Sequence, residues 1–200
     1  MSARSDSYSL RRRAVVEALL AERGDLLLVT GLGAPTWDAA AAGDSPLTFP
    51  LWGAMGGAAM VGLGLALAQP HRRVLVITGD GELLMGLGAL ATIAVQQPQN
   101  LAIAVLDNER YGETGQQATH TAWQVDLAAV ARSVGFPSAL VVAQQEEVPA
   151  AAAQLQQAPG PLLAVFKVRA EDLPLVLPPK DGAFLKDRFR MALLGEGAGG

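Results

Sequence analysis

Short apolar runs alternate with longer helix-forming segments along most of the chain. The short runs lie at residues 26–30, 74–78, 101–107, 139–142 and 162–167, and they are rich in Leu, Val, Ile and Ala. Such runs are typical of strands that are buried on both faces of a parallel sheet. The longer segments predict helices over residues 10–22, 56–68, 83–97, 126–134 and 146–157. This alternation predicts an α/β fold, a doubly wound and mainly parallel sheet with helices on both faces.

The length and composition fit a single domain. Residues 1–200 match the size of one α/β domain, and a hydrophobic fraction of 50% is enough for a sizeable core. The sequence shows neither an internal repeat nor an interdomain linker. The proline-rich residues 173–180 predict an extended surface strap before a last helix over residues 184–194, so that 173–200 form a C-terminal strap and helix. We expect the glycine-rich tail, 195–200, to fray.

Polar residues follow two of the predicted strands at the points where they end. Gly79-Asp80-Gly81 comes directly after residues 74–78, and Asn108 follows the strand 101–107. Because the carboxyl ends of neighbouring parallel strands meet at one edge of a sheet, we expect Asp80 and Asn108 to lie together. Their oxygens are ligands that Mg²⁺ prefers, and the helix that begins at Gly81 can direct N–H groups at phosphate. An isolated Asp-Gly is also an ordinary turn, so the interpretation depends on the two motifs together.

Taken together, the two motifs resemble the diphosphate-binding domain of thiamine-diphosphate enzymes. That family carries Gly-Asp-Gly and then, at a similar spacing, Asn-Asn; Asp107 departs from the pattern, whereas Asn108 matches its ligand position. The resemblance implies bound thiamine diphosphate and a Mg²⁺ ion held by Asp80, Asn108 and the main-chain carbonyl of Arg110. It also implies that the diphosphate lies among Gly79, Gly81, Glu82, Tyr111 and Gly112, with Gly31 and Gly33 at its border.

A second motif, Gly53-Ala54-Met55-Gly56, precedes the predicted helix 56–68. In the family, a bulky apolar residue at the position of Met55 lies beneath the cofactor and bends it, so that the amino group of its pyrimidine ring reaches the reacting carbon. By the same resemblance, the Gly53 carbonyl and the Met55 N–H hold the aminopyrimidine edge. The alternative for Met55 is a methionine that fills a gap in the core.

A polar loop follows the second motif of the expected metal site. It contains Glu113, Thr114, Gln117, His120 and Thr121, and His120 is one of only two histidines in the chain. We expect this loop to close over a substrate, with Glu113 and His120 as catalytic candidates beside Met55. The alternative for His120 is an ordinary surface histidine.

Composition and charge narrow the possible partners and compartments. The net charge is −4 without a basic stripe, which argues against nucleic acid as the main partner. The apolar segment 53–67 is too short and too rich in glycine for a transmembrane helix, and no secretory signal is visible, so we expect the cytoplasm. Because cysteine is absent, disulfides and thiolate chemistry are excluded. Arg11, Arg12 and Arg13 are interpreted as a solvated helix start or an intersubunit contact.

Within the family, the chain resembles the small β-type subunits of sulfopyruvate decarboxylases and the C-terminal part of phosphonopyruvate decarboxylases. This likeness extends from residues 53–67 through both motifs and residues 111–117 to 186–189. It implies non-oxidative decarboxylation of a small 2-oxo acid to an aldehyde. No residues resemble the pyrimidine-binding domain that supplies the activating glutamate in this family. We therefore expect a hetero-oligomer in which a partner subunit carries that domain.

Other functions remain open on the sequence alone. A carboligase of the acetolactate-synthase type shares the first steps of the reaction, and a catalytically silent scaffold subunit would keep the same fold. An oxidative subunit is less consistent with the chain, because it has no cysteine ligands for an iron–sulfur cluster. A dinucleotide-binding domain fits poorly, since Gly31-Leu32-Gly33 is followed by Ala-Pro-Thr rather than by a further glycine.

Overall fold

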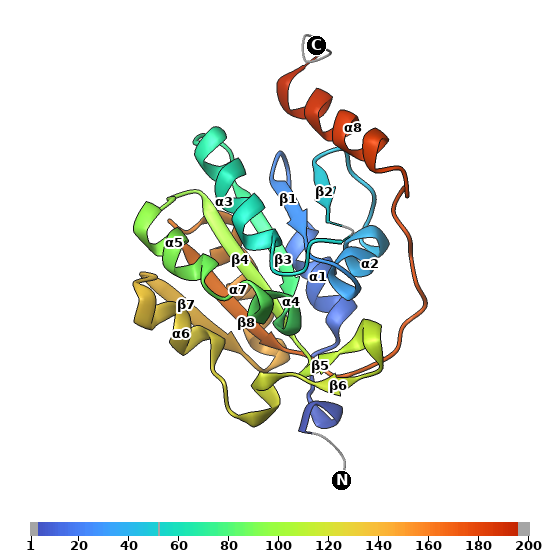
Figure 1. The fold of residues 1–200 in the computed structure, drawn as a ribbon, viewed down its shortest axis with the longest axis vertical. Helices are drawn as coiled ribbons and strands as arrows, with labels where there is room; N and C mark the ends of the chain where they lie inside the picture. Colours follow the sequence, from blue (N-terminus) through green and yellow to red (C-terminus); the bar gives the residue numbers. More distant parts are fainter. Residues whose placement is uncertain (1–3, 52, 196–200) are drawn as a thin grey trace.

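The computed structural model describes residues 4–51 and 53–195, and its centre is a parallel sheet (Figure 1). Six strands pair in the order β2-β1-β3-β4-β8-β7, all parallel to one another. Their bounds are β1 Leu27–Thr30, β2 Thr48–Pro50, β3 Val74–Gly79, β4 Leu101–Asp107, β7 Ser138–Val142 and β8 Leu162–Lys167. A separate antiparallel hairpin joins β5 Arg110–Tyr111 to β6 Gln117–Ala118. The sheet confirms the predicted fold class.

Helices cover both faces of this sheet. They are α1 Arg12–Leu20, α2 Ala34–Ala41, α3 Ala58–Ala68, α4 Asp80–Met85, α5 Ala89–Gln96, α6 Leu127–Val134, α7 Val148–Gln157 and α8 Gly182–Leu194. Short 3₁₀ turns lie at η1 Arg4–Ser7, η2 Gly112–Thr114, η3 His120–Trp123 and η4 Gln145–Glu147. None of the helices within the described residues is long and apolar enough to cross a membrane.

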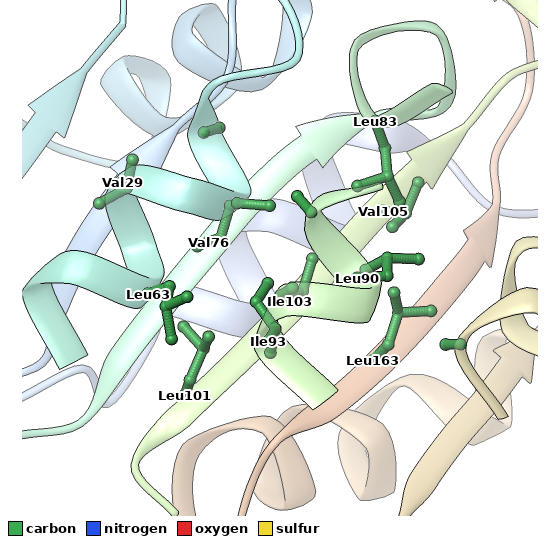
Figure 2. Packing of buried hydrophobic residues seen from close by; sticks show 14 of the residues in the cluster. Val29, Leu63, Val76, Leu83, Leu90, Ile93, Leu101, Ile103, Val105 and Leu163 are labelled. Atoms are coloured by element: carbon green, nitrogen blue, oxygen red, sulfur yellow. The ribbon is translucent and has the colours of Figure 1, made fainter. Parts of the chain in front are cut away.

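Alternate residues of each strand enter two separate cores. On β3, Val74 and Val76 face the core that contains α3, α5 and α6, whereas Leu75 and Ile77 face the core of α1 and α7. Figure 2 shows the first of these cores, in which Leu63 of α3 lies near the central strands. Because both faces of the central strands are buried, these strands read as continuous apolar runs, which is why they could be found in the sequence.

Most predicted helices and strands are confirmed, with ends that shift by a residue or two. The elements α2 and β2 were not predicted as regular structure. The single helix predicted over residues 83–97 is wrong, because α4 ends at Met85, residues 86–88 form a turn and α5 begins at Ala89. A Cβ on Gly86 would lie 2.1 Å from the carbonyl oxygen of Gly56, so the turn is a place where two backbones touch. A continuous helix with a side chain at this position would displace the loop that carries Met55.

The C-terminal segment runs without regular structure over residues 169–181, which are called the strap from here on, and then forms α8. Figure 1 shows it passing along one side of the molecule from β8 to α8. Gly195 is the last described residue, so the rest of the predicted frayed tail lies outside the described residues.

The arginines at the start of α1 contact this strap; Arg12 is buried, which corrects its interpretation as part of a solvated helix start, whereas Arg11 is exposed. Arg12 is only 7% exposed, and both Arg12 and Arg13 form ion pairs with the fully buried Asp38. Arg11 pairs with Glu171 of the strap at 2.5 Å. Buried guanidinium groups of this kind require partners, and α2 and the strap provide them.

Two glycines of α3 test how tightly the helix packs on the sheet. A Cβ on Gly62 would lie 2.3 Å from Val76 Cγ2, whereas a Cβ on Gly64 would meet no atom within 4 Å. We expect Gly62→Ala to lower the free energy of unfolding by roughly 1–3 kcal/mol through overpacking. Gly64→Ala should leave it unchanged or raise it by up to about 1 kcal/mol, because alanine favours a helix. Urea unfolding of both variants measures the difference, and equal effects would contradict the close contact between α3 and β3.

Candidate functional site

A pocket of about 240 Å³ opens at the carboxyl edge of the sheet, where β3 and β4 end. Figure 1 shows α4 close to the β5–β6 hairpin at this edge, and both contribute to the pocket wall. The parallel register of β3 and β4 explains why residues far apart in the sequence meet here. The residues predicted for the site that line the pocket are Met55, Gly79, Asp80, Gly81, Glu82, Asn108, Arg110, Tyr111, Gly112 and Glu113.

Asp80 is the first residue of α4 and is only 1% exposed. Its Oδ2 accepts hydrogen bonds from the hydroxyls of Thr119, at 2.5 Å, and Thr121, at 3.2 Å. Burial, together with the nearby carboxylate of Asp107, raises the pKa of Asp80 to about 7. Both effects disfavour the anion, and a cation bound beside Asp80 would offset them.

Asp107, which departs from the family pattern, is neutralised by a residue that the sequence pattern did not single out. Its Oδ2 lies 2.5 Å from Lys167 Nζ at the end of β8, and the two residues are partners in the strand register. Its Oδ1 accepts from the Thr121 hydroxyl at 2.8 Å and from the Glu109 N–H at 3.2 Å. A lysine at the end of an otherwise apolar strand was the available signal. Its partner becomes evident only when β8 is placed beside β4.

Asn108 and Arg110 are brought to the pocket by a tight turn. The side-chain oxygen of Asn108 accepts from the Arg110 N–H at 3.0 Å, and Glu109 between them has a φ of 60°. Arg110 then begins the hairpin with β6. This turn brings Asn108 and Arg110 to the same pocket that Asp80 lines from the neighbouring strand end.

Met55 lines the pocket from the loop before α3, and Glu82 anchors that loop. Glu82 is 3% exposed, and its Oε1 accepts from the N–H groups of Gly56, at 2.9 Å, and Ala58, at 3.1 Å. Its other oxygen accepts from the Thr78 hydroxyl. The side chain of Glu82 is therefore committed to the start of α3, and it acts on the pocket by fixing the loop of Met55.

Close backbone contacts account for several of the predicted glycines. A Cβ on Gly81 would lie 2.5 Å from the ring of Tyr111, and a Cβ on Gly33, whose φ is 80°, would lie 2.6 Å from Glu113 Oε1. Gly31 similarly approaches the Thr78 hydroxyl. Gly31, Gly33 and Gly53 are not among the lining residues, although Leu32 and Ala34 are. The first two thus permit tight packing behind the wall of the pocket.

The two catalytic candidates of the polar loop separate in the structure. Glu113 lines the pocket and accepts from the indole N–H of Trp37 at 3.2 Å. His120 starts η3, is exposed and lies outside the lining residues. The structure therefore brings Glu113 to the pocket and does not bring His120 there.

Part of the wall comes from segments that no motif predicts. These residues are Arg12, Leu32, Trp37, Glu171, Asp172, Leu173 and Leu175. Four of them belong to the strap, which has no periodicity that a sequence reading can use. One ion pair, from Arg11 to Glu171, and two hydrogen bonds, from Arg12 and Arg13 to main-chain carbonyls, attach the strap to the start of α1.

A comparison with known families identifies this arrangement. Residues 39–166 match the family described as thiamine pyrophosphate enzyme, C-terminal TPP binding domain. The chain belongs to this family. The predicted resemblance is thereby confirmed, and both Asp80 and Asn108 lie within the matched region.

Individual relatives agree with the family assignment. The chain is 46% identical over 127 residues to the sulfopyruvate decarboxylase subunit beta of Methanothermobacter thermautotrophicus, which covers 64% of this chain and 68% of that protein. It is 38% identical over 181 residues to the phosphonopyruvate decarboxylase of Streptomyces viridochromogenes, covering 90% of this chain and 45% of that protein. The chain thus spans less than half the length of the second relative.

More distant similarities extend the comparison. An acetolactate synthase of Zea mays is 31% identical over 161 residues, covering 72% of this chain and 24% of that protein. The solved structure of benzoylformate decarboxylase from Polynucleobacter necessarius superposes with a TM-score of 0.69 at 19% identity, covering 88% of this chain and 36% of that one. This structural similarity supports the fold.

The raised pKa of Asp80 predicts how stability depends on pH. The folded chain binds a proton on Asp80 up to about pH 7, whereas the unfolded chain releases it near pH 4, so stability falls as pH rises across this interval. We expect the free energy of unfolding of the metal-free chain to decrease from pH 5 to pH 8. Asp80→Asn should flatten this slope, whereas Glu146→Gln on an exposed turn should not. Urea titrations at several pH values test this, and an unchanged slope in Asp80→Asn would contradict it.

Proposed function

We propose that the chain is the diphosphate-binding subunit of a split thiamine-diphosphate- and Mg²⁺-dependent enzyme, and that this enzyme decarboxylates a small 2-oxo acid to an aldehyde. The observation that carries the proposal is the meeting of Met55, Asp80, Asn108 and Arg110 in one pocket of a chain that belongs to this family. The relatives named sulfopyruvate and phosphonopyruvate decarboxylase favour a 2-oxo acid with a second anionic group.

The residues present fit the metal and the cofactor. A carboxylate at Asp80, an amide at Asn108 and the carbonyl of Arg110 form an all-oxygen donor set of the kind that Mg²⁺ prefers. Gly79, whose Cβ position is free of neighbours within 4 Å, lets a phosphate approach the backbone beside Asp80. Met55 would support the cofactor from the loop before α3.

The chemistry is divided between the cofactor and the chain. Thiamine diphosphate, when bound, supplies the electron sink for cleavage of the bond to the carboxylate. The chain orients it and holds the metal. Trp37 and Leu173 provide apolar wall, and Glu113, held by the Trp37 indole, is the carboxylate positioned to hold a proton inside the pocket.

The partner subunit would complete the site beside α3. This helix has no charged residue, yet Met60 is 41% exposed and Leu67 is 52% exposed. An apolar helix face left open at the end of the Met55 loop favours burial against another polypeptide. We propose that this partner carries the pyrimidine-binding domain and its activating glutamate, and that the assembly works in the cytoplasm.

Carboligation is the second candidate, and the similarity to acetolactate synthase favours it. Both reactions remove CO₂ from a 2-oxo acid and differ in what accepts the remaining carbon unit. Product analysis with two different oxo acids separates them, because only a carboligase joins their carbon skeletons. A silent scaffold subunit would form neither product.

Calorimetric titration of thiamine diphosphate, with and without Mg²⁺, tests the proposal. We expect tight binding only with Mg²⁺ and only in the complex with the partner subunit. Asp80→Ala should abolish this binding, whereas Glu146→Gln should bind as the wild type does. Wild-type affinity in Asp80→Ala would contradict the assignment of the metal site. Absence of binding by the wild-type complex would favour the scaffold.

Met55 gives a separate test of cofactor orientation. If its side chain bends the bound cofactor, Met55→Ala should lower kcat by about 100-fold, since misplacement by an ångström can cost that much. The dissociation constant of the cofactor should change by less than about fivefold, because the metal donors are intact. Met55→Leu, which keeps an apolar side chain of similar volume, should retain most of kcat. Equal kcat values for the alanine variant and the wild type would exclude this role.

A further inference from the structure

Glu109 lies between two proposed metal donors and is almost completely buried. Its residue is 2% exposed, although it sits in a turn between Asn108 and Arg110. A carboxylate removed from water requires charged or hydrogen-bonding partners, because its desolvation is otherwise strongly unfavourable. The partners of Glu109 therefore determine whether this turn can exist. Residues 107–112 are called the ligand loop below.

The partners come from the beginning of the chain. Arg4 donates to Glu109 Oε1 through Nε, at 2.9 Å, and through Nη2. The Tyr8 hydroxyl donates to the same oxygen at 2.6 Å. Burial and this hydrogen bond raise the pKa of Tyr8, so the hydroxyl keeps its proton. Lys167 Nζ lies 3.9 Å from that oxygen as well. This oxygen thus accepts hydrogen bonds from two N-terminal side chains and lies within ion-pair distance of a lysine at the end of β8.

The backbone of Glu109 is held in a conformation that its side chain must help to stabilise. Its φ of 60° lies in the left-handed region, which is unfavourable for a residue with a Cβ. The Glu109 N–H donates to Asp107 Oδ1, and its carbonyl accepts from the Thr119 N–H at 3.0 Å. Rotation at this residue would redirect both the Asn108 side chain and the Arg110 carbonyl.

Arg4 also reaches the other side of the ligand loop. Its Nη2 donates to the carbonyl oxygen of Thr121 at 2.9 Å, and the Thr121 hydroxyl contacts both Asp80 and Asp107. Arg110 Nη2 lies 3.8 Å from Asp6 Oδ1 in the same N-terminal turn. The N-terminal residues therefore contact both β5, through Arg110, and η3, through Thr121.

The N-terminal segment, residues 4–10, is itself attached to the sheet. Leu10 forms a parallel bridge with Val168 just after β8, and its carbonyl accepts from the Arg169 N–H at 2.9 Å. The Ala170 N–H donates to the Ser5 carbonyl at 3.2 Å. Arg4 and Tyr8 thus project from a fixed backbone, which allows them to fix the ligand loop in turn.

We propose that Arg4 and Tyr8 are positioning residues for Mg²⁺, which act by clamping Glu109 and thereby orienting Asn108 and the Arg110 carbonyl toward the metal. This inference rests on the proposed function, since it assigns the N-terminal segment to the same metal site. Neither residue touches the metal. Their contribution is to hold the oxygen donors in position before the metal binds. Residues that orient metal ligands through hydrogen bonds commonly raise the affinity for the metal in this way.

The test compares Arg4→Met, Arg4→Lys and Tyr8→Phe with a matched control in the complex with the partner subunit. Arg132→Met is the control, because the Arg132 side chain is 51% exposed, as is that of Arg4, and lies on α6 away from the ligand loop. The readout is the Mg²⁺ concentration that half-saturates binding of thiamine diphosphate, measured by calorimetry. We expect this concentration to rise about 10- to 100-fold in Arg4→Met and severalfold in Tyr8→Phe. Arg4→Lys should recover part of the loss.

A second readout needs neither metal nor cofactor. Amide hydrogen exchange at Thr119, which donates to the Glu109 carbonyl, reports opening of the ligand loop. We expect it to accelerate about tenfold or more in Arg4→Met, and to remain unchanged in Arg132→Met. If Arg4→Met does not fold, Tyr8→Phe, which lacks only one hydroxyl, carries both measurements.

The outcomes separate the two levels of inference. If the wild type binds with Mg²⁺ and both Arg4→Met and Tyr8→Phe stay within twofold of it, the clamp is excluded and the proposed function stands. If the wild-type complex binds no cofactor, the proposed function and the metal role of the clamp both fall. Unchanged exchange at Thr119 in the folded variants would also overturn the clamp.

Discussion

Two carboxylates buried side by side at the ends of β3 and β4 impose the main constraint on this structure. Asp80 and Asp107 are each 1% exposed, and the hydroxyl of Thr121 bridges them. Lys167 pairs with Asp107 and also lies near Glu109, but it forms no ion pair with Asp80. Among the described residues, Asp80 has hydroxyl partners but no cationic one, so its anion is disfavoured in the metal-free chain. The site is therefore built with an electrostatic deficit that a bound divalent cation would correct.

The same edge also requires backbones to approach one another closely. Gly56 and Gly86 touch where the Met55 loop crosses the turn between α4 and α5. Glu82 fixes the loop on one side of this contact through two N–H groups, so α4 serves both the proposed metal site and the position of Met55. Glycine at position 86 leaves room for the Met55 loop where α4 ends.

A feature could be predicted from the sequence when it depends on residues within one segment or on the general geometry of parallel strands. The central strands were predictable because burial on both faces leaves continuous apolar runs, and Asp80 and Asn108 were predictable because parallel strands deliver their ends to one edge. Three other features could not be predicted: the turn between α4 and α5, the pairing of Lys167 with Asp107, and the part of the pocket wall that the strap forms. Each of these features depends on contacts between segments far apart in the chain. His120 was expected in the pocket because it is close in sequence to the ligand loop, but η3 carries its side chain outside the pocket lining.

The N-terminal segment and the strap both support the region of the pocket for a related physical reason. A loop that presents oxygen donors to a metal gains little from hydrophobic burial, so its conformation must be fixed by charge pairs and hydrogen bonds. Arg4 holds the ligand loop from the N-terminal side, and Arg12, at the start of α1, holds both Asp38 and the strap. The rigid sheet thus sets where the donors emerge, while these arginines set how they are directed. In this arrangement the proposed metal site could be preformed in one chain, and the proposed partner would need to supply only the groups that act on the opposite end of the cofactor.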